Sequence, residues 1–292
     1  MSEATGPYTL VLGIAQDAGY PQAGDRSSPA WSDPSLRRLA TCLALIDPRN
    51  GRRWLFDATP DFKEQLHRLD AAFPRADVPG LDAIFLTHAH IGHYTGLIHV
   101  GVEGIGAREV PVFAMPRMEQ FLRGNGPWEQ LVSMKNIEIR PLSDSETVKL
   151  ADDVRVTPLM VPHRDEYSET VGFRIGGPTQ AVLFLPDITG WAAWEDEGTR
   201  IEDILRTVDV AYLDGSFMSG DELPGRDLSK IKHPFISDSI ARFATLPGPE
   251  RRKVRFIHLN QSNPLIRGGE AALNDVERSG CGVAQEGEIV RL

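Results

Sequence analysis

Short apolar runs of strand length alternate with segments of helical periodicity along most of the chain. Apolar patterns bounded by turn residues predict strands at 8–14, 41–46, 54–56, 83–86, 110–114, 154–159, 171–175, 181–185, 210–213 and 254–258. Helical spacing of apolar residues predicts helices at 61–69, near 118–122, at 201–208 and at 236–243. Because both kinds of element occur in both halves without a repeat or a linker, the pattern predicts layered α/β architecture in one domain covering residues 1–292.

Two polar segments interrupt this alternation. Residues 22–33 are rich in Gly, Ser, Pro and Asp, and this composition predicts a surface loop. Residues 219–232 have a similar composition and are long enough to form a lid or an active-site loop.

The composition is that of a soluble globular protein, since 41% of the 292 residues are apolar and 25% are charged. These values argue against a disordered chain, a disulfide-rich secreted module and a collagen-like repeat. No run approaches the roughly 18 apolar residues of a membrane helix, and no leader is visible, so we expect a cytoplasmic protein without a membrane partner. Cys42 and Cys281 could form one bridge, but thiols this far apart are expected to be free and buried.

The charge of the chain narrows the range of partners. The formal net charge is -10, from 31 basic and 41 acidic side chains. This excess argues against nucleic acid as a partner, because phosphate backbones need a basic face. A local basic patch can still bind a small anion. We therefore expect a small-molecule substrate, and the sequence leaves a homodimer open.

The most informative stretch is FLTHAHIGHYTGL, residues 85–97. His88, His90 and His93 directly follow a predicted strand, whose alternation points the first two imidazoles the same way, and the next turn can bring back the third. Imidazole is a preferred ligand of Zn, Fe and Ni. A His-rich surface loop and a minor structural metal site are the alternatives for this stretch considered alone.

Three further side chains that can bind metal lie at the ends of predicted strands. They are His163, Asp187 and His258. Taken singly, an aspartate at this place often caps a helix, and a lone histidine is usually just hydrogen-bonded. In combination with the histidine cluster they predict one metal site. Its ligands would be His88, His90, His93, His163, Asp187 and His258.

This series resembles the signature of the metallo-β-lactamase superfamily, His-x-His-x-Asp-His followed by His, Asp and His. The resemblance extends from Tyr8 to about Leu265. It implies a four-layer αββα sandwich with metals in a cleft at one edge, and it implies that Asp57 supports the ligands from behind. Segments GIAQDAGYP (13–21), DATP (57–60), TGL (95–97) and HLNQSNP (258–264) resemble, more narrowly, the branch that contains the pyrroloquinoline quinone biosynthesis B proteins.

One position departs from the superfamily signature. Gly92 stands where the motif has the aspartate that ligates the second metal. We therefore expect a strong first site at His88, His90 and His163, and a weaker second one at His93 and His258, with Asp187 between them. Water, or a carboxylate from elsewhere such as Asp17, could fill the gap. Zinc is the expected metal, as one or two ions, with Fe or Mn as alternatives.

The leading functional hypothesis is a metal-dependent hydrolase. A metal-bound hydroxide would attack an ester, phosphodiester, lactone or similar small molecule, and Asp187 would hold the hydroxide or take up its proton. His233 is a candidate acid–base or substrate-binding group, and Tyr94 and Asp214 are candidates for the cleft wall, although Asp214 could equally be a turn residue. The alternatives are an iron-dependent oxygenase or oxidoreductase, and a non-catalytic carrier.

Overall fold

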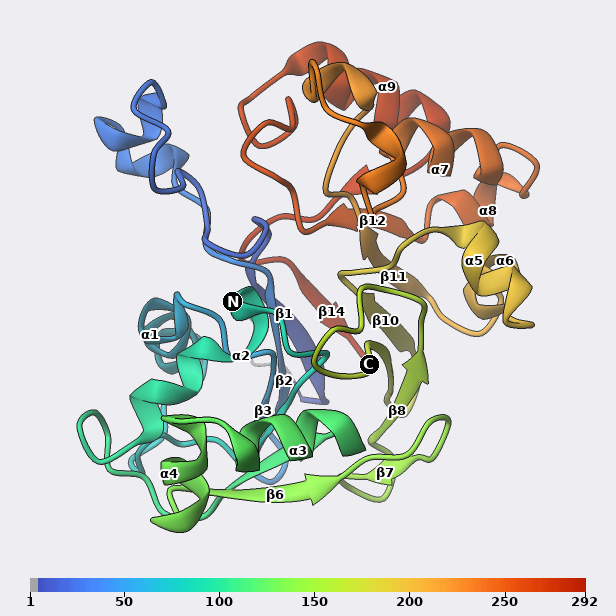
Figure 1. Ribbon diagram of the computed structural model, residues 1–292. Coiled ribbons are helices and arrows are strands. Elements are labelled where there is room, and N and C mark those ends of the chain that lie inside the picture. Colours follow the sequence, from blue (N-terminus) through green and yellow to red (C-terminus); the bar gives the residue numbers. More distant parts are fainter. Residues whose placement is uncertain (1–4) are drawn as a thin grey trace.

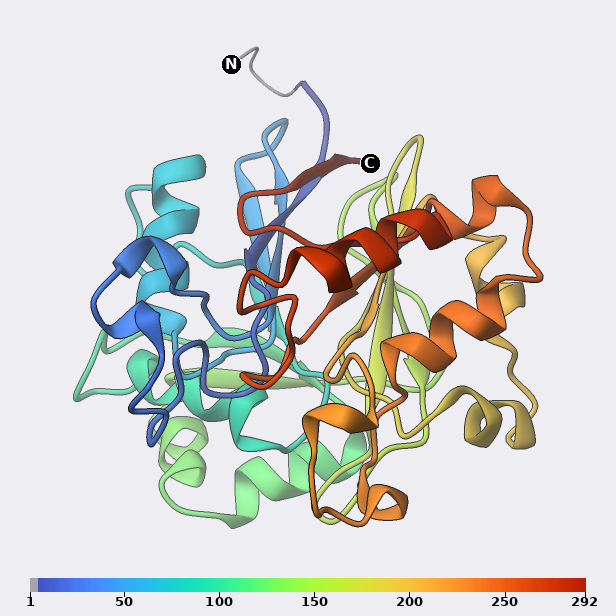
Figure 2. The same cartoon turned by 90° about the horizontal axis from the view of Figure 1, so that it is seen from above.

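Two seven-stranded β-sheets lie face to face, and helices cover the outer face of each (Figures 1 and 2). The computed structural model describes residues 5–292. Viewed from above, the order of layers is helices, sheet, sheet, helices, which confirms the predicted αββα sandwich. Among the described residues, none of the helices combines the length and the apolar character needed to cross a membrane.

The first sheet combines an antiparallel and a parallel half. β1, β2 and β3 are antiparallel, whereas β3 to β6 are parallel. Its spatial order is β14 (Ile289–Arg291), β1 (Tyr8–Gly13), β2 (Cys42–Asp47), β3 (Arg52–Phe56), β4 (Ala83–Phe85), β5 (Val110–Ala114) and β6 (Ile137–Pro141). The helices of this half are α1 (Phe62–Ala72), α2 (Ile91–Tyr94), α3 (Pro116–Gly124) and α4 (Trp128–Ser133).

The second sheet is parallel from β10 to β13 and antiparallel from β7 to β10. Its spatial order is β13 (Gly282–Val283), β12 (Val254–Ile257), β11 (Val210–Asp214), β10 (Ala181–Leu185), β9 (Val171–Gly176), β8 (Arg155–Met160) and β7 (Val148–Lys149). The helices of this half are α5 (Trp191–Asp196), α6 (Ile201–Leu205), α7 (Ile236–Phe243), α8 (Gly248–Arg251) and α9 (Glu270–Ser279).

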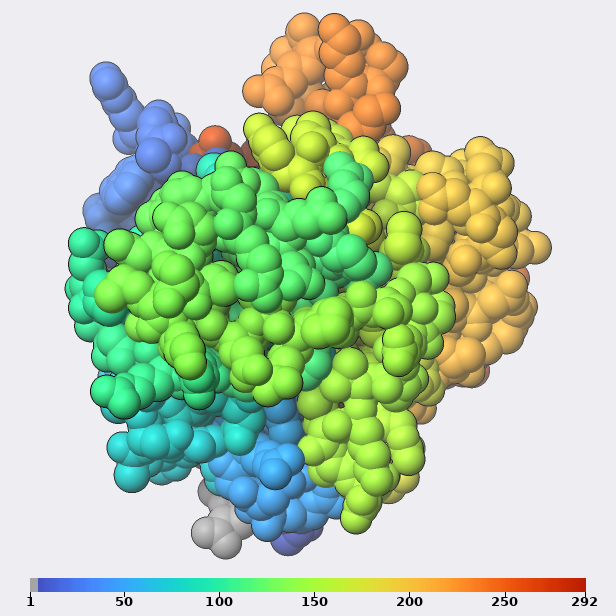
Figure 3. Space-filling view, turned by 60° about the horizontal axis from the view of Figure 1, so that its bottom comes forward, coloured from blue at the N-terminus to red at the C-terminus, as the bar shows by residue number. Residues whose placement is uncertain are grey.

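Most predicted elements are present with small shifts of their ends. The predicted helix 201–208 ends already at Leu205, because the chain turns there to enter β11. Cys42 and Cys281 are buried and free, as expected. The segment 22–33 contains a short 3-10 helix (Pro29–Trp31), and 219–232 contains two (Gly220–Glu222 and Leu228–Lys230). Figure 3 shows both segments, in blue and orange, projecting from the body of the protein.

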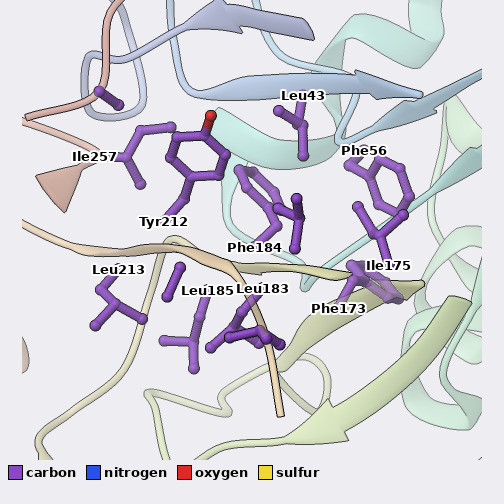
Figure 4. Close-up of a cluster of buried hydrophobic side chains, with 14 of the residues drawn as sticks. Leu43, Phe56, Phe173, Ile175, Leu183, Phe184, Leu185, Tyr212, Leu213 and Ile257 are labelled. Carbon is purple, nitrogen blue, oxygen red and sulfur yellow. The ribbon is translucent and has the colours of Figure 1, made fainter. Parts of the chain in front are cut away.

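The core between the sheets is built around packed phenylalanines (Figure 4). The ring of Phe56 on β3 lies 5.1 Å from Phe85 on β4, 5.4 Å from Phe173 on β9 and 6.3 Å from Phe184 on β10. Three of these four rings belong to strands that lead directly toward the site described below. Tight packing therefore fixes the strand ends that carry its polar side chains.

Replacing Phe173 with alanine is expected to lower the free energy of unfolding by about 3–5 kcal/mol, because it leaves a cavity between the sheets. Urea denaturation followed by circular dichroism measures the change. Val78→Ala is a suitable control, since Val78 is 70% exposed and its truncation should change stability by less than about 0.5 kcal/mol. Equal effects of the two substitutions would contradict this view of the core.

One edge of the sandwich joins the two sheets directly. Ala15, after β1, forms a parallel bridge with Leu259, after β12. The amide of Val171 on β9 donates a hydrogen bond to the carbonyl of Thr87, which follows β4. The ends of strands from both sheets therefore come together at this edge, and ligands are expected at such carboxyl ends of parallel strands.

Candidate metal centre

The candidate metal centre lies where these strand ends converge. The first sheet contributes Asp57 after β3 and the segment 87–93 after β4. The second sheet contributes His163, Asp187 and His258, which follow β8, β10 and β12. The predicted strand 254–258 ends one residue early, because His258 has a left-handed backbone (φ 65°) that turns the chain out of the strand.

Three imidazoles, of His88, His90 and His163, form what we call the first ligand cluster. One nitrogen from each ring lies within 4.8 Å of the others. Nε2 of His88 is 2.8 Å from Nδ1 of His90. The opposite nitrogens are engaged, since His88 Nδ1 lies 2.9 Å from the Thr87 hydroxyl and His90 Nε2 lies 3.3 Å from the Glu166 carboxylate. When those nitrogens hold the ring protons, two lone pairs face each other, an arrangement suited to a cation.

Asp17, His93 and His258 form the second ligand cluster, with one ligand atom of each within 4.8 Å of the others. Asp187 lies between the two clusters. Its Oδ1 is 3.6 Å from Nε2 of His163, while its Oδ2 is 3.3 Å from Nε2 of His93 and 3.4 Å from Nε2 of His258. One carboxylate oxygen therefore faces each cluster, which is the placement of a bridging ligand.

The rings of the second cluster are oriented from behind. His93 Nδ1 lies 2.8 Å from Oδ2 of Asp57, and His258 Nδ1 lies 3.0 Å from the Ser216 hydroxyl. Asp57 is itself held by the amide and the hydroxyl of Thr87, at 2.8 and 3.0 Å. Such contacts fix the tautomer and leave Nε2 of each ring directed at the centre. The structure thus places Asp57 where the resemblance implies it.

Polar atoms without hydrogen-bond partners gather at this centre. Among residues 5–292, the buried side-chain atoms without a partner include Nε2 of His93, both ring nitrogens of His163, Oδ2 of Asp187 and Nε2 of His258. Buried polar groups are normally paired, since an unpaired one costs about 1–3 kcal/mol. Imidazole nitrogens and a carboxylate oxygen directed at one volume are a donor set for a divalent transition metal, so the residues fit such an ion.

Burial keeps several of these rings neutral, which is the form that binds metal. It lowers the pKa of His88 well below the ordinary imidazole value. Burial, together with the charges of neighbouring imidazoles, likewise lowers the pKa of His163 to about 2 and that of His258 to about 3. These rings therefore need no deprotonation at neutral pH before they can bind a cation.

His93 differs from those rings because its pKa is raised, and the neighbouring Asp187 carboxylate contributes to this shift. Burial alone would lower the pKa of His93, but the carboxylates of Asp187 and Asp57 outweigh burial and raise that pKa well above the ordinary value. Burial raises the pKa of Asp187 to about 7, against the opposing effect of His93. A metal ion and a proton therefore compete for the space between them.

His233 lies beside the first cluster, with its ring 5.2 Å from that of His163. Its Nδ1 is 2.8 Å from Oδ2 of Asp214 and 3.1 Å from the Ser216 hydroxyl. Burial alone would lower the pKa of His233, but Asp214 outweighs burial and raises it. Because both partners engage Nδ1, the ring is held in one orientation with Nε2 free for another group.

The structure brings together all the residues that the sequence proposed as metal ligands or catalytic groups. These are His88, His90, His93, His163, Asp187, His233 and His258, with Asp17 and Asp214 beside them. Their roles as ligands and catalysts stay predictions. The expectation for Tyr94 is wrong, because its ring is buried against Phe121 and Trp128 in the outer helical layer instead of lining the cleft.

Sequence reasoning missed three supporting residues: Thr87, Glu166 and Ser216. Thr87 directly precedes the candidate ligand His88, and Ser216 lies two positions after Asp214, a candidate for the cleft wall, so a hydroxyl close to a candidate site residue was a usable signal. Glu166 reaches His90 from the loop after His163, a contact that depends on how the loop closes and leaves no local pattern.

The fold and this site define a member of the metallo-β-lactamase superfamily. The chain belongs to that family, because the family model of the beta-lactamase superfamily domain matches residues 52–259. Within the family it is similar to coenzyme PQQ synthesis protein B. The protein of that name from Xanthomonas oryzae pv. oryzae is 26% identical over 313 aligned residues, which cover 97% of this chain and 99% of the relative.

Solved structures agree on the fold. Zinc-bound PqqB from Methylobacterium extorquens has a TM-score of 0.81 and 22% sequence identity, and the match covers 98% of this chain and all of that one. A diphosphatase of the PhnP family has a TM-score of 0.68 and 21% identity, with 98% of this chain and 97% of that one covered. At these identities the matches show the αββα fold and no more.

Proposed function

We propose that this protein is a metal-dependent hydrolase that cleaves small-molecule esters, with phosphodiesters as the favoured class. The observation that carries the proposal is the pair of facing ligand clusters, with buried donor atoms that lack partners and with Asp187 between them. The zinc bound in the similar PqqB structure supports zinc as the metal. A tris-imidazole cluster with an open position is also typical of catalytic zinc.

Each side chain has a defined place in this scheme. His88, His90 and His163 would hold one ion, and His93 and His258 a second, with Asp187 shared between them. A bound ion of this kind would lower the pKa of water to about 7 and would polarise the group under attack.

The protein's own groups would position water and substrate. Asp187 places one oxygen toward each cluster, so it can accept a hydrogen bond from the attacking water and align it. His233, oriented by Asp214 through Nδ1, presents Nε2 as the donor of a proton to the departing oxygen. Arg164 directly follows His163 and places a positive charge close enough to act on that ring, which favours an anionic substrate over a neutral lactone.

Metal removal tests this function. Protein purified without added metal should contain stoichiometric zinc or manganese, measured by elemental analysis, and should hydrolyse bis(4-nitrophenyl) phosphate. Dialysis against a chelator should abolish turnover, and added zinc or manganese should restore it. Loss of metal should also lower stability by about 2.7 kcal/mol relative to protein at a metal concentration 100 times its Kd.

The same measurements address the alternatives. Full turnover by metal-free protein would contradict the proposal. Stoichiometric iron together with oxygen consumption would favour the iron-dependent oxygenase, a candidate supported by the similarity to a quinone-cofactor synthesis protein. Absence of any turnover by fully loaded protein, across ester, lactone and phosphodiester substrates, would favour a carrier.

A further inference from the structure

We propose that Asp17, from the loop after β1, supplies the carboxylate ligand that the histidine motif lacks at Gly92. Asp17 would then complete the second ligand cluster with His93 and His258. This inference rests on the proposed metal centre and concerns its second cation alone. It predicts a two-ion centre in which one ligand has moved from the helix after β4 to a different part of the chain.

The space around Gly92 supports the exchange. A Cβ atom at this position would lie 2.3 Å from Oδ1 of Asp17 and 2.5 Å from its Cα, closer than such atoms approach in proteins. Gly92 lies in α2 and has no positive φ, so its backbone conformation does not require glycine. Glycine within a helix costs about 1 kcal/mol relative to alanine. Glycine at position 92 therefore leaves the space that the Asp17 side chain occupies.

The carboxylate of Asp17 lies where a ligand of the second cation is needed. Its Oδ1 is 3.6 Å from Nε2 of His93, an atom with no hydrogen-bond partner among the described residues. One ligand atom each of Asp17, His93 and His258 lies within 4.8 Å of the others. Asp187 completes the surroundings, with Oδ2 3.3 Å from the same nitrogen of His93. Two imidazoles and two carboxylates thus surround one volume.

The backbone holds Asp17 in this place at a conformational cost. Its φ is 39°, in a region that residues other than glycine rarely adopt. The segment before it is fixed on both sides, because Ala15 bridges Ala40 and Leu259 and the amide of Gln16 donates to the Leu259 carbonyl. Strained residues that the surrounding structure holds this firmly are concentrated at functional sites.

A purely electrostatic role toward His93 would not need a third carboxylate. Asp57 already accepts the hydrogen bond from His93 Nδ1 at 2.8 Å, and Asp187 lies 3.3 Å from Nε2. With Asp17 added, three carboxylates surround one imidazole. A divalent cation between Asp17 and Asp187 offsets this excess of negative charge, whereas one protonated ring does not.

Asp17→Asn is the primary test, since it keeps the shape of the side chain and removes its charge. Wild-type protein should bind two zinc ions per chain, measured by elemental analysis after gel filtration and by competition with a fluorescent chelator. The variant should keep one ion at wild-type affinity and bind the second at least about 100-fold more weakly. Asp25→Asn, on the same loop and outside both clusters, is the matched control and should keep two.

Gly92→Ala tests the same inference without removing any donor atom. Its methyl group displaces Asp17, so the second ion should again be weakened while the first stays bound, which also shows that the variant is folded. Two ions at wild-type affinity in either Asp17→Asn or Gly92→Ala would overturn the assignment. Loss of both ions in Asp17→Asn would overturn it too, because Asp17 would then not act on the second cation specifically. A wild-type chain without metal would instead refute the proposed function and this inference together.

Discussion

His163→Ala is expected to reduce hydrolysis by more than about 100-fold and to release metal from the first ligand cluster. Substitutions of groups that only orient metal ligands typically cost 10–100-fold in affinity or activity, and a ligand itself should cost more. Neither ring nitrogen of His163 has a hydrogen-bond partner among the described residues. Its removal therefore breaks no hydrogen-bond network, and the metal-free variant should lose only the stability that the truncation of one buried ring costs relative to the metal-free wild type.

The measurements are zinc content, turnover of bis(4-nitrophenyl) phosphate and thermal unfolding with and without chelator. His67→Ala is the matched control, because His67 is exposed on α1 and outside the centre. A His163→Ala protein that keeps its zinc and its activity would refute the first cluster. If the metal-free variant were much less stable than the metal-free wild type, the effect would belong to folding instead of metal binding.

His233→Gln is expected to lower kcat by about 10²–10⁴-fold for substrates with a poor leaving group, the usual contribution of a general acid. An alkyl or phenyl phosphodiester needs a proton on its departing oxygen. A 4-nitrophenyl ester does not, because nitrophenolate is already stable. The variant should therefore keep most of its activity on the nitrophenyl substrate, and a comparison of the two substrates at equal metal content measures the effect.

This comparison separates proton donation from other roles of His233. A similar loss on both substrates, with metal content unchanged, would indicate a role in binding substrate. A fall in metal content would make His233 a ligand and would refute the assignment. Asp214→Asn should reproduce the leaving-group dependence in weaker form, because Asp214 holds the ring through Nδ1 at 2.8 Å.

The ligands could be found from the sequence because each follows a strand that hydrophobicity marks clearly. The run before His88, the run before Asp187 and the run before His258 are apolar and end at a polar side chain. Parallel strands of one sheet bring their carboxyl ends to one edge, which places Asp187 near His258, and the resemblance to the superfamily signature predicted that the histidines after the other strand meet them. Gly92 showed that a ligand was missing.

The sequence could only suggest which group replaces the carboxylate that is missing at Gly92. Asp17 and Gly92 are far apart in the chain, and no local pattern encodes that a Cβ atom at position 92 would lie 2.3 Å from Oδ1 of Asp17. For the same reason the contact from Glu166 to His90 was not foreseen.

Several outer elements escaped prediction because they lack a distinct pattern. β13 and β14 have two and three residues, too few for alternation to show. Helix α9 buries only Ala272 and Val276 among ten residues, so its apolar stripe is weak. Such elements owe their stability to tertiary packing more than to their own sequence.

The origin of the donor groups in both sheets has a mechanical consequence. An ion held jointly by His93 from one sheet and His258 from the other would cross-link the two sheets and oppose their sliding or separation. The resistance of the sandwich to opening then scales with occupancy, because a ligand that binds only the closed form stabilises it. Amide exchange and proteolysis at this edge should therefore become slower as the concentration of available metal rises.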